Sequence, residues 1–181
     1  DSRRIVYARN VEGYTELTLG ELTGPTEISE FPQPDLPGDV AGGVSVGPEG
    51  DRLAFSTSGR GVNTNVYVAD VGTLRAGDDA EDASAAIDRW THAGTAGIPA
   101  ETFVEPELVH YETFDGREIP ALFSVPGDAA DAGLPVIVDI HGGPESQRRP
   151  SFSGLTQYFL SRGYAVLEPN VRGSTGYGKA Y

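Results

Sequence analysis

An apolar run at residues 136–140 constrains what this chain can fold into more than any other feature. The run does not alternate between apolar and polar residues, which indicates a strand covered on both faces, as in a parallel sheet flanked by helices. A glycine-rich stretch at residues 141–144 follows at once. The sequence therefore predicts a buried parallel strand whose carboxyl end opens into a tight turn.

The residues after this turn continue the pattern of an α/β sheet. Residues 151–162 carry apolar side chains at helical spacing, and Gly163 supplies a C-terminal stop. Residues 164–167 then give a second short apolar strand. Strand, helix and strand in this order predict a right-handed crossover and the start of a doubly wound sheet. The helix is expected to bury a face formed by Phe152, Leu155, Phe159 and Leu160.

The first hundred residues have a different pattern. Short runs of alternating apolar and polar residues are separated by turn residues, which is typical of antiparallel hairpins. The repeated unit looks like one blade of a β-propeller, with the turn at 47–51 linking the second and third strands of the blade. Because a blade packs against its neighbours, an isolated pair is expected to be poorly stable. The expected strands cover residues 4–9, 14–19, 43–46, 52–56 and 65–69.

The pattern changes after Pro106. Two strand-like runs, at 108–113 and 118–125, predict another antiparallel hairpin ahead of the parallel strand. The chain is therefore expected to combine an all-β part at residues 1–103 with an α/β part at residues 104–181.

Charge and composition exclude several classes of protein. Twenty-seven acidic residues oppose thirteen basic ones, and Lys179 is the only lysine. Since phosphate contacts need clustered Lys and Arg, we expect no nucleic-acid partner. An acidic surface nearly devoid of lysine indicates adaptation to high salt, with an ordinary acidic protein as the alternative. No run is long enough to span a membrane, so we expect no membrane partner and a cytoplasmic location, with an upstream signal peptide left open.

Metal and thiol chemistry are also disfavoured. The chain has no cysteine, so neither disulfides nor thiolate catalysis is possible. An acidic stretch at 76–86 reads as a solvated insertion. The alternative, a calcium loop, lacks the spaced acids and terminal Glu of an EF-hand. We expect no cofactor and no metal.

Gly142 and Gly143 are the strongest candidates for chemistry. A backbone N–H must come within about 2.7–3.1 Å of a developing oxyanion, and a Cβ on either residue is expected to obstruct the turn or the substrate. In α/β-hydrolases a turn of this kind after a buried parallel strand forms half of an oxyanion hole. The plain alternative is an ordinary Gly-Gly-Pro turn. A second glycine-rich segment, 170–178, leaves a strand at the same edge, and it lacks the Gly-x-x-x-x-Gly-Lys-Ser/Thr pattern of a phosphate cradle.

The other candidate residues are expected to be structural. Ser45 lies in a Gly-x-Ser-x-Gly match at 43–47, but a nucleophile elbow must join a buried strand to a helix, and this match lies in a hairpin strand. His92 and His110 have no serine or aspartate placed to make either a general base. His141 ends the apolar strand and is expected to position the neighbouring loops, since the catalytic histidine comes last in this fold.

The segments at 104–121, 139–147 and 169–178 resemble the prolyl oligopeptidase family of serine peptidases, most closely its acylaminoacyl-peptidase and dipeptidyl-aminopeptidase branch. The resemblance implies the end of a β-propeller at 1–103 joined to the N-terminal part of an α/β-hydrolase domain at 104–181, both incomplete. It also implies cleavage of short peptides by acyl transfer through a Ser-Asp-His triad.

By the family pattern, Gly143 matches the residue whose backbone N–H is one oxyanion donor. Arg172 and Tyr177 match loop positions near the active-site floor and are expected to be structural. The triad would lie beyond Tyr181, so the chain alone is expected to be catalytically inactive.

Two other classes stay open. A carboxylesterase-type α/β-hydrolase would share the oxyanion turn without needing the preceding strands at residues 1–70. A non-catalytic propeller-containing protein would share those strands without needing the turn. Neither the substrate specificity nor the oligomeric state follows from the sequence.

Overall fold

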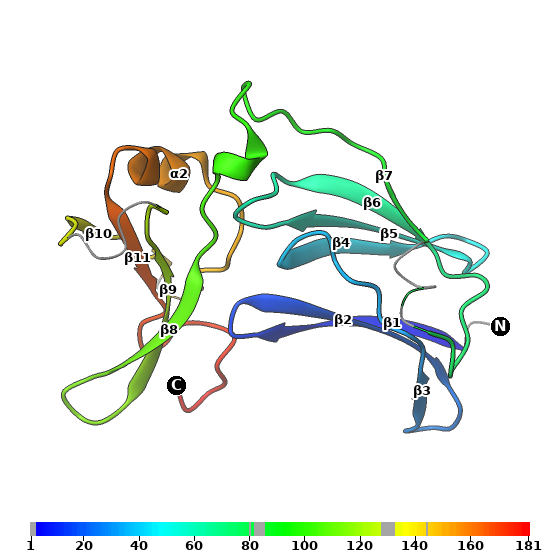
Figure 1. The fold of residues 1–181 in the computed structure, drawn as a ribbon. Coiled ribbons are helices and arrows are strands. Elements are labelled where there is room, and N and C mark those ends of the chain that lie inside the picture. The colour runs from blue at the N-terminus through cyan, green and yellow to red at the C-terminus, as the bar shows by residue number, and fades with distance from the viewer. Residues whose placement is uncertain (1–2, 80, 82–85, 128–132, 144) are drawn as a thin grey trace.

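The computed structural model describes residues 3–79, 81, 86–127, 133–143 and 145–181. Figure 1 shows two sheets facing each other, both formed by residues 4–89, which we call the first half of the chain. A third sheet, formed later in the chain, lies to one side of them. In these described ranges, no helix has both the length and the apolar character that a membrane crossing requires.

The first sheet contains three antiparallel strands in the order β1-β2-β3. A tight turn at Glu12 and Gly13 joins the first two strands, and both turn residues have positive φ, 51° and 94°. Such a two-residue turn matches the twist of an antiparallel pair and fixes its register. The strands are β1 (Arg4–Val11), β2 (Tyr14–Leu22) and β3 (Ile28–Glu30).

The second sheet contains four consecutive antiparallel strands in the order β4-β5-β6-β7. This is the arrangement of a propeller blade, and the propeller itself stays a prediction. The prediction that the turn at 47–51 links the second and third strands of the blade is wrong. The strand at 87–89 is the fourth strand of this sheet, so the turn links the first and second strands. The strands are β4 (Val40–Val46), β5 (Arg52–Ser58), β6 (Asn65–Asp70) and β7 (Ile87–Arg89).

The two sheets share one apolar core. Phe55 and Tyr67, on neighbouring strands of the second sheet, stack with ring centroids 6.1 Å apart. Alternation along each strand sends every second side chain to the same face, so two such faces can close on each other. The buried cluster consists of Leu17, Leu19, Phe31, Leu53, Phe55, Tyr67, Ala69, Val71 and Leu74.

The third sheet is mixed, with the order β10-β11-β9-β8. The expected hairpin is present as the antiparallel pair β8 and β9. The expected parallel pair is also confirmed, because β10 runs parallel to β11. A short 3-10 helix, η1 (Ala100–Thr102), precedes this sheet. Its strands are β8 (Glu107–Glu112), β9 (Glu118–Ser124), β10 (Val136–Val138) and β11 (Ala165–Pro169).

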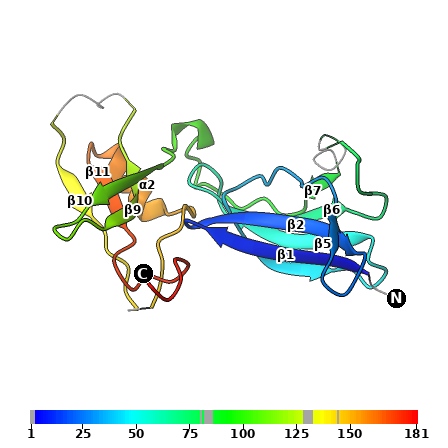
Figure 2. The same ribbon diagram turned by 90° about the horizontal axis from the view of Figure 1, so that it is seen from below.

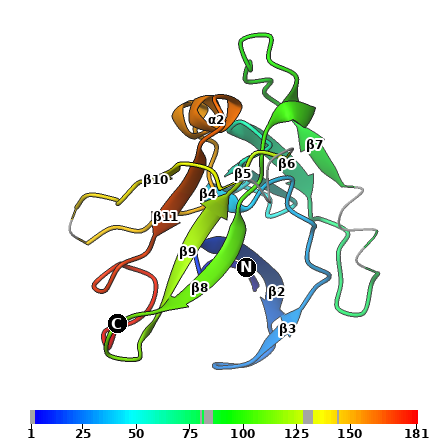
Figure 3. The ribbon, with the colours of Figure 1, turned by 60° about the vertical axis from the view of Figure 1, so that its left-hand side comes forward.

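Helix α2 (Gly154–Ser161) packs against β11 (Figure 3). It begins after Ser153, whose side chain accepts a hydrogen bond from the backbone N–H of Thr156 and so caps the helix. The predicted buried face is wrong at Leu155, which is 64% exposed. The helix instead turns Gln157 inward, where its side-chain amide bonds both backbone groups of Val104.

The predicted strand at 136–140 is also wrong in two respects. It ends at Val138, and the side chain of the next residue, Asp139, pairs with Arg148 at 2.5 Å. It is also not covered on both faces, since Val136 and Val138 are 49% and 55% exposed. β10 is the edge strand of the sheet, so it has a strand neighbour on one side only.

Candidate active site

The two glycine-rich segments leave neighbouring parallel strands at the same edge of the third sheet. Residues 139–143 follow β10, and residues 170–178 follow β11. The pairing continues one step past the strand end, because the backbone N–H of Asp139 donates to the carbonyl of Leu167 at 2.9 Å. In open α/β sheets this carboxyl edge is where ligands bind. The fold therefore brings together the two motifs that the sequence predicts to act together.

Gly143 has a backbone that only glycine adopts easily. Its φ is 144°, and a Cβ built on it would lie 3.0 Å from the Cβ of Ser146 and 3.1 Å from the backbone nitrogen of Glu145. The residue is exposed, and no described residue accepts a hydrogen bond from its N–H. An exposed donor that no described residue accepts from, held in a turn that favours glycine, is suited to binding an anionic oxygen.

Gly142 differs from its neighbour. A Cβ there would meet nothing within 4 Å, and its φ is not in the left-handed region. A side chain at Gly142 would therefore not obstruct the turn, and its obstruction of the substrate stays a prediction. Pro144 lies outside the described residues.

His141 joins the turn to the second segment. Its Nε2 lies 2.7 Å from the hydroxyl of Ser174, and its Nδ1 lies 3.1 Å from the carbonyl oxygen of Gly142. Ser174 in turn donates to the carbonyl of Val171 at 2.6 Å. With the hydroxyl proton used in that bond, the imidazole Nε2–H is the donor to Ser174. The contact fits a positioning role for His141, which stays a prediction.

Ser174 and His141 resemble a nucleophile with its base, but the arrangement is unsuitable for catalysis. The serine is only 4% exposed, so a substrate carbonyl cannot reach it. Its hydroxyl is committed to a backbone carbonyl, and the far nitrogen of the imidazole faces a carbonyl oxygen where a catalytic histidine would face a carboxylate. The sequence offered one signal for Ser174, its place inside the glycine-rich motif.

Asn170 is a second residue that sequence reasoning missed. It is completely buried, and its side-chain amide bonds both backbone groups of Arg148, at 2.7 and 3.0 Å. The same amide nitrogen donates to the hydroxyl of Tyr177 at 2.9 Å. The ring of Tyr177 lies 4.8 Å from that of Tyr181, and burial raises the pKa of the Tyr177 phenol. Tyr177 thus anchors the second segment from within.

Arg172 lies against the turn of the β8–β9 hairpin. Its guanidinium bonds both carboxylate oxygens of Asp115, at 2.6 and 2.7 Å, and lies 5.4 Å from the ring centroid of Phe114. The paired guanidinium holds the pKa of the Asp115 carboxyl well below its usual range. Figure 3 shows the red C-terminal segment close to this hairpin, where Arg117 also bonds the carbonyl of Tyr181 at 2.9 Å.

The remaining candidates lie apart from the turn. Ser45 is exposed, at a register shift between Gly42 and Ser45 that marks a bulge in β4. His110 pairs with Glu12 at 2.8 Å, and His92 is exposed. None of the three joins the glycine-rich segments.

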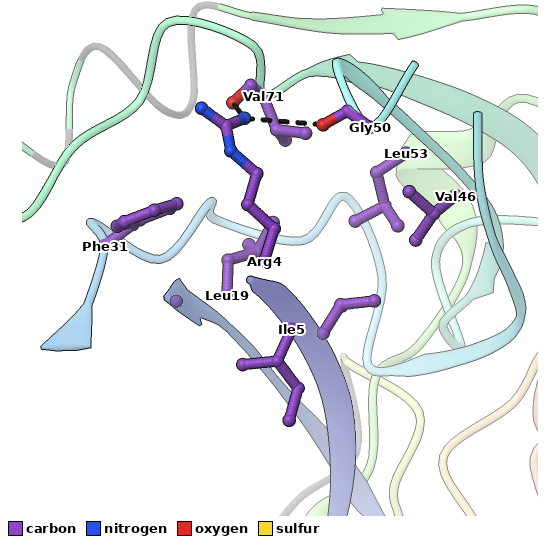
Figure 4. Close-up of a pocket in the computed structure, with 10 residues that line it drawn as sticks. Arg4, Ile5, Leu19, Phe31, Val46, Gly50, Leu53 and Val71 are labelled. Carbon is purple, nitrogen blue, oxygen red and sulfur yellow. Dashed lines mark hydrogen bonds between the residues drawn. The ribbon is translucent and has the colours of Figure 1, made fainter. Parts of the chain in front are cut away.

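Two cavities lie away from the glycine-rich turn. The first, shown in Figure 4, holds about 30 Å³ between the two facing sheets, with Arg4 at one side bonded to the carbonyls of Gly50 and Val71. That volume suits about one water molecule. The second holds about 690 Å³ between α2 and the segment at 94–104. Neither cavity includes a residue of the two glycine-rich motifs.

Among the described residues, no group of three or more acidic or histidine side chains could hold a metal ion. The acidic stretch at 76–86 lies partly outside the described residues, so the calcium alternative is not tested there.

No family model matches the chain. Over 52 residues it is 46% identical to dipeptidyl aminopeptidase BIII of Pseudoxanthomonas mexicana, a match that covers 29% of the chain and 8% of that relative. Over 67 residues it is 39% identical to acylamino-acid-releasing enzyme 1 of Oryza sativa subsp. japonica, covering 36% of the chain and 8% of the relative.

Solved structures match over nearly the whole chain. A puromycin hydrolase superposes with a TM-score of 0.69 at 26% identity, covering 94% of this chain and 24% of that one. A puromycin-hydrolysing peptidase of Mycobacterium tuberculosis superposes with a TM-score of 0.71 at 23% identity, covering 98% and 26%, and that likeness concerns the fold alone. This chain therefore spans about a quarter of the length of these structures.

Dipeptidyl aminopeptidase BIII and the Mycobacterium tuberculosis protein are named as peptidases, and this chain covers only a small part of each. These similarities support the resemblance of its motifs to the prolyl oligopeptidase family.

Proposed function

We propose that this chain is part of a serine peptidase that hydrolyses short peptides by acyl transfer, with the backbone N–H of Gly143 as one donor of its oxyanion hole. In this proposal residues 1–103 are the end of a β-propeller and residues 104–181 begin the α/β-hydrolase domain. The observation that carries the proposal is the exposed Gly143 N–H, which has no acceptor among the described residues and lies at the carboxyl edge of parallel strands.

The proposed reaction needs an anion-binding turn of this kind. A serine hydroxyl attacks the scissile carbonyl carbon, its proton passes to a histidine, and the carbonyl oxygen becomes an oxyanion. A preorganised N–H about 2.7–3.1 Å from that oxygen stabilises the charge as it develops. The second donor, by the family pattern, is the residue after the nucleophile. We assign no residue of this chain as nucleophile, acid or base, because the triad is proposed to follow Tyr181.

The proposed reaction requires no cofactor, and the setting we propose for it is a salt-rich cytoplasm. The support for high salt is the excess of acids over bases with a single lysine, Lys179. Such a surface repels itself when counterions are scarce and is screened when they are abundant.

Labelling with a fluorophosphonate probe tests the proposed function. The full-length protein expressed from its gene is expected to be labelled at one serine downstream of Tyr181, and to release nitroaniline from aminoacyl or dipeptidyl nitroanilides. The 181-residue chain alone is expected to stay unlabelled. Labelling of Ser45 or Ser174 would contradict the assignment. Hydrolysis of simple esters without any peptide hydrolysis would favour the carboxylesterase alternative.

A further inference from the structure

The segment that directly follows the candidate oxyanion turn is held by the first half of the chain. Arg149 reaches across to the β1–β2 turn, where its Nε donates to the carbonyl of Gly13 at 2.7 Å and its Nη2 donates to the hydroxyl of Thr15 at 2.8 Å. Figure 2 shows the tip of the β1–β2 hairpin reaching this segment, which leads from β10 toward α2. A side chain only six residues after Gly143 is thus fixed by a sheet formed more than a hundred residues earlier.

Two more contacts fix the same segment. The side-chain amide of Asn10 donates to the side-chain oxygen of Gln147 at 2.6 Å. The hydroxyl of Ser58, at the end of β5, accepts from the backbone N–H of Phe152 at 3.0 Å. We call residues 147–152 the docking segment. It is bonded by both sheets of the first half, at its beginning, middle and end.

A partly buried network of charges connects the docking segment to the strand ends. Arg148 pairs with Asp139 at the end of β10 and lies 3.9 Å from Glu168 on β11. Glu168 also forms an ion pair with Arg60, from the loop after β5, and both of these side chains are only 2% exposed. Glu168 is therefore connected through Arg60 to the first half of the chain and through Arg148 to the docking segment. Asp139 is connected to the docking segment through Arg148 as well.

The Arg60 pair has poor geometry for a purely stabilising contact. The Nε and Nη1 atoms of Arg60 are buried and find no partner among the described residues. Burying a charge that is only partly paired costs free energy, which a well-packed apolar pair would avoid. A role in setting the position of β11 relative to the first half accounts for charges at this place.

We propose that the docking segment positions the oxyanion turn, and that Arg149 and Arg60 are positioning residues through which the first half of the chain controls the placement of the Gly143 N–H. This inference rests on the proposed function for its effect on rate, and on the contacts alone for its effect on the turn. The first half then contributes to the chemical step itself, in addition to any control of substrate access.

The test uses Arg149→Met in the full-length protein, with Arg4→Met as the matched control. Arg4 also donates to backbone carbonyls, those of Gly50, Val71 and Gly72, but all of them lie within the first half (Figure 4). Both variants are expected to lower the melting temperature. Only Arg149→Met is expected to speed hydrogen exchange in the peptide covering 139–146 and to lower kcat by roughly 10–100-fold with little change in KM, as misplacement by about 1 Å does.

Asn10→Ala serves as the second variant should Arg149→Met fail to fold, because the bond from Asn10 to Gln147 is at the surface. It is expected to change exchange and kcat in the same direction by a smaller factor, about 3-fold. Unchanged exchange at 139–146 in Asn10→Ala and Arg149→Met, or an equal effect from Arg4→Met, would overturn the proposal. A protein without peptidase activity would remove the proposed function but leave the exchange result to be judged on its own.

A double variant examines the buried pair. Arg60→Met alone leaves the buried Glu168 with only the 3.9 Å contact to Arg148 and is expected to lower the melting temperature strongly. Arg60→Met with Glu168→Leu removes both charges and is expected to regain most of that loss. If the pair positions the turn, kcat stays low in the double variant. Recovery of kcat together with the melting temperature would show that the pair acts on stability only.

Discussion

The first half of the chain and the third sheet differ in how far their apolar side chains are buried. The two facing sheets close a core in which Leu53 and Phe55 are each 1% exposed. In the third sheet, Val136 and Val138 are 49% and 55% exposed, and Ile140, just after β10, is 59% exposed, although all three belong to the apolar run at 136–140. The difference shows that burial follows from what lies opposite a strand as well as from the strand's own composition.

The same contrast separates structural from functional features. Where alternation lets two faces close within the chain, the residues are occupied by packing. At the carboxyl edge of the third sheet the backbone is held in place but Gly143 is left exposed. In this chain the carboxyl edge of the third sheet therefore presents an exposed hydrogen-bond donor.

The largest expected difference between the regions is in the cost of removing apolar groups. Phe55→Ala creates a cavity in the shared core beside Tyr67 and is expected to lower the free energy of unfolding by about 3–5 kcal/mol. Val136→Ala removes exposed surface and is expected to change it by about 0.5 kcal/mol or less. Urea denaturation of the two variants measures both. Similar costs would mean that the two regions are packed alike.

A smaller effect is expected from the helix cap. Ser153→Ala removes the acceptor for the Thr156 N–H and is expected to cost about 1 kcal/mol. Ser153→Asp restores an acceptor and serves as the control. Exchange at α2 and β11 should rise in Ser153→Ala, while exchange in β5 and β6 stays unchanged. A uniform rise across the chain would contradict the separation of the two regions.

Salt should act more on the first half than on the third sheet. More than half of the acidic residues lie in 1–103, so screening relieves more repulsion there. The melting temperature is expected to rise as potassium chloride approaches molar concentration, and protection from exchange should rise most in the first half. A melting temperature that is flat or falls with added salt would remove the high-salt hypothesis.

The smallest effect concerns the ion pair of Asp115 with Arg172. The folded-state pKa of Asp115 lies below its unfolded value of about 3.9, so the pair stabilises the fold above that pH and this contribution is lost as the pH falls below it. Both groups are exposed, so the effect is weak. Asp115→Asn should therefore lose less of its melting temperature between pH 5 and pH 2.5 than the parent. Equal acid sensitivity would show that the pair contributes nothing.

The sequence allowed much of this fold to be predicted because its signals are local. Alternation and turn residues placed β1, β2, β5 and the β8–β9 hairpin, and the order of strand, helix and strand predicted the parallel pair. The errors arose at positions whose surroundings depend on residues far away in the sequence. Gln157 turns inward to bond Val104, 53 positions earlier, and β10 has a strand neighbour on one side only.

The candidate site was predictable only in part for the same reason. The turn at Gly142 and Gly143 is formed by consecutive residues, so the sequence motif alone predicts where the turn lies. The hydrogen bond between His141 and Ser174 joins residues 33 positions apart, and the hydrogen bond from Arg149 to Gly13 joins residues 136 positions apart. Contacts between residues so far apart produce no repeating pattern that could be recognised in a single sequence.

The central claim is that the Gly143 N–H binds the oxyanion, and replacing that N–H alone tests it most directly. Proline would delete the donor but cannot adopt a φ of 144°, and alanine would keep the donor but force the contacts with Ser146 and Glu145. Glycolic acid at position 143 replaces the amide by an ester and leaves the glycine backbone free. The same replacement at Gly142 is the matched control.

In the full-length protein, the ester at position 143 is expected to lower kcat for a dipeptidyl nitroanilide by about 10²–10³-fold, as removal of one oxyanion donor does, with a much smaller change in KM. The ester at position 142 is expected to have a far smaller effect, and both proteins should keep the parental melting temperature. A folded ester variant at position 143 with near-parental kcat would contradict the account and leave this turn a structural element only.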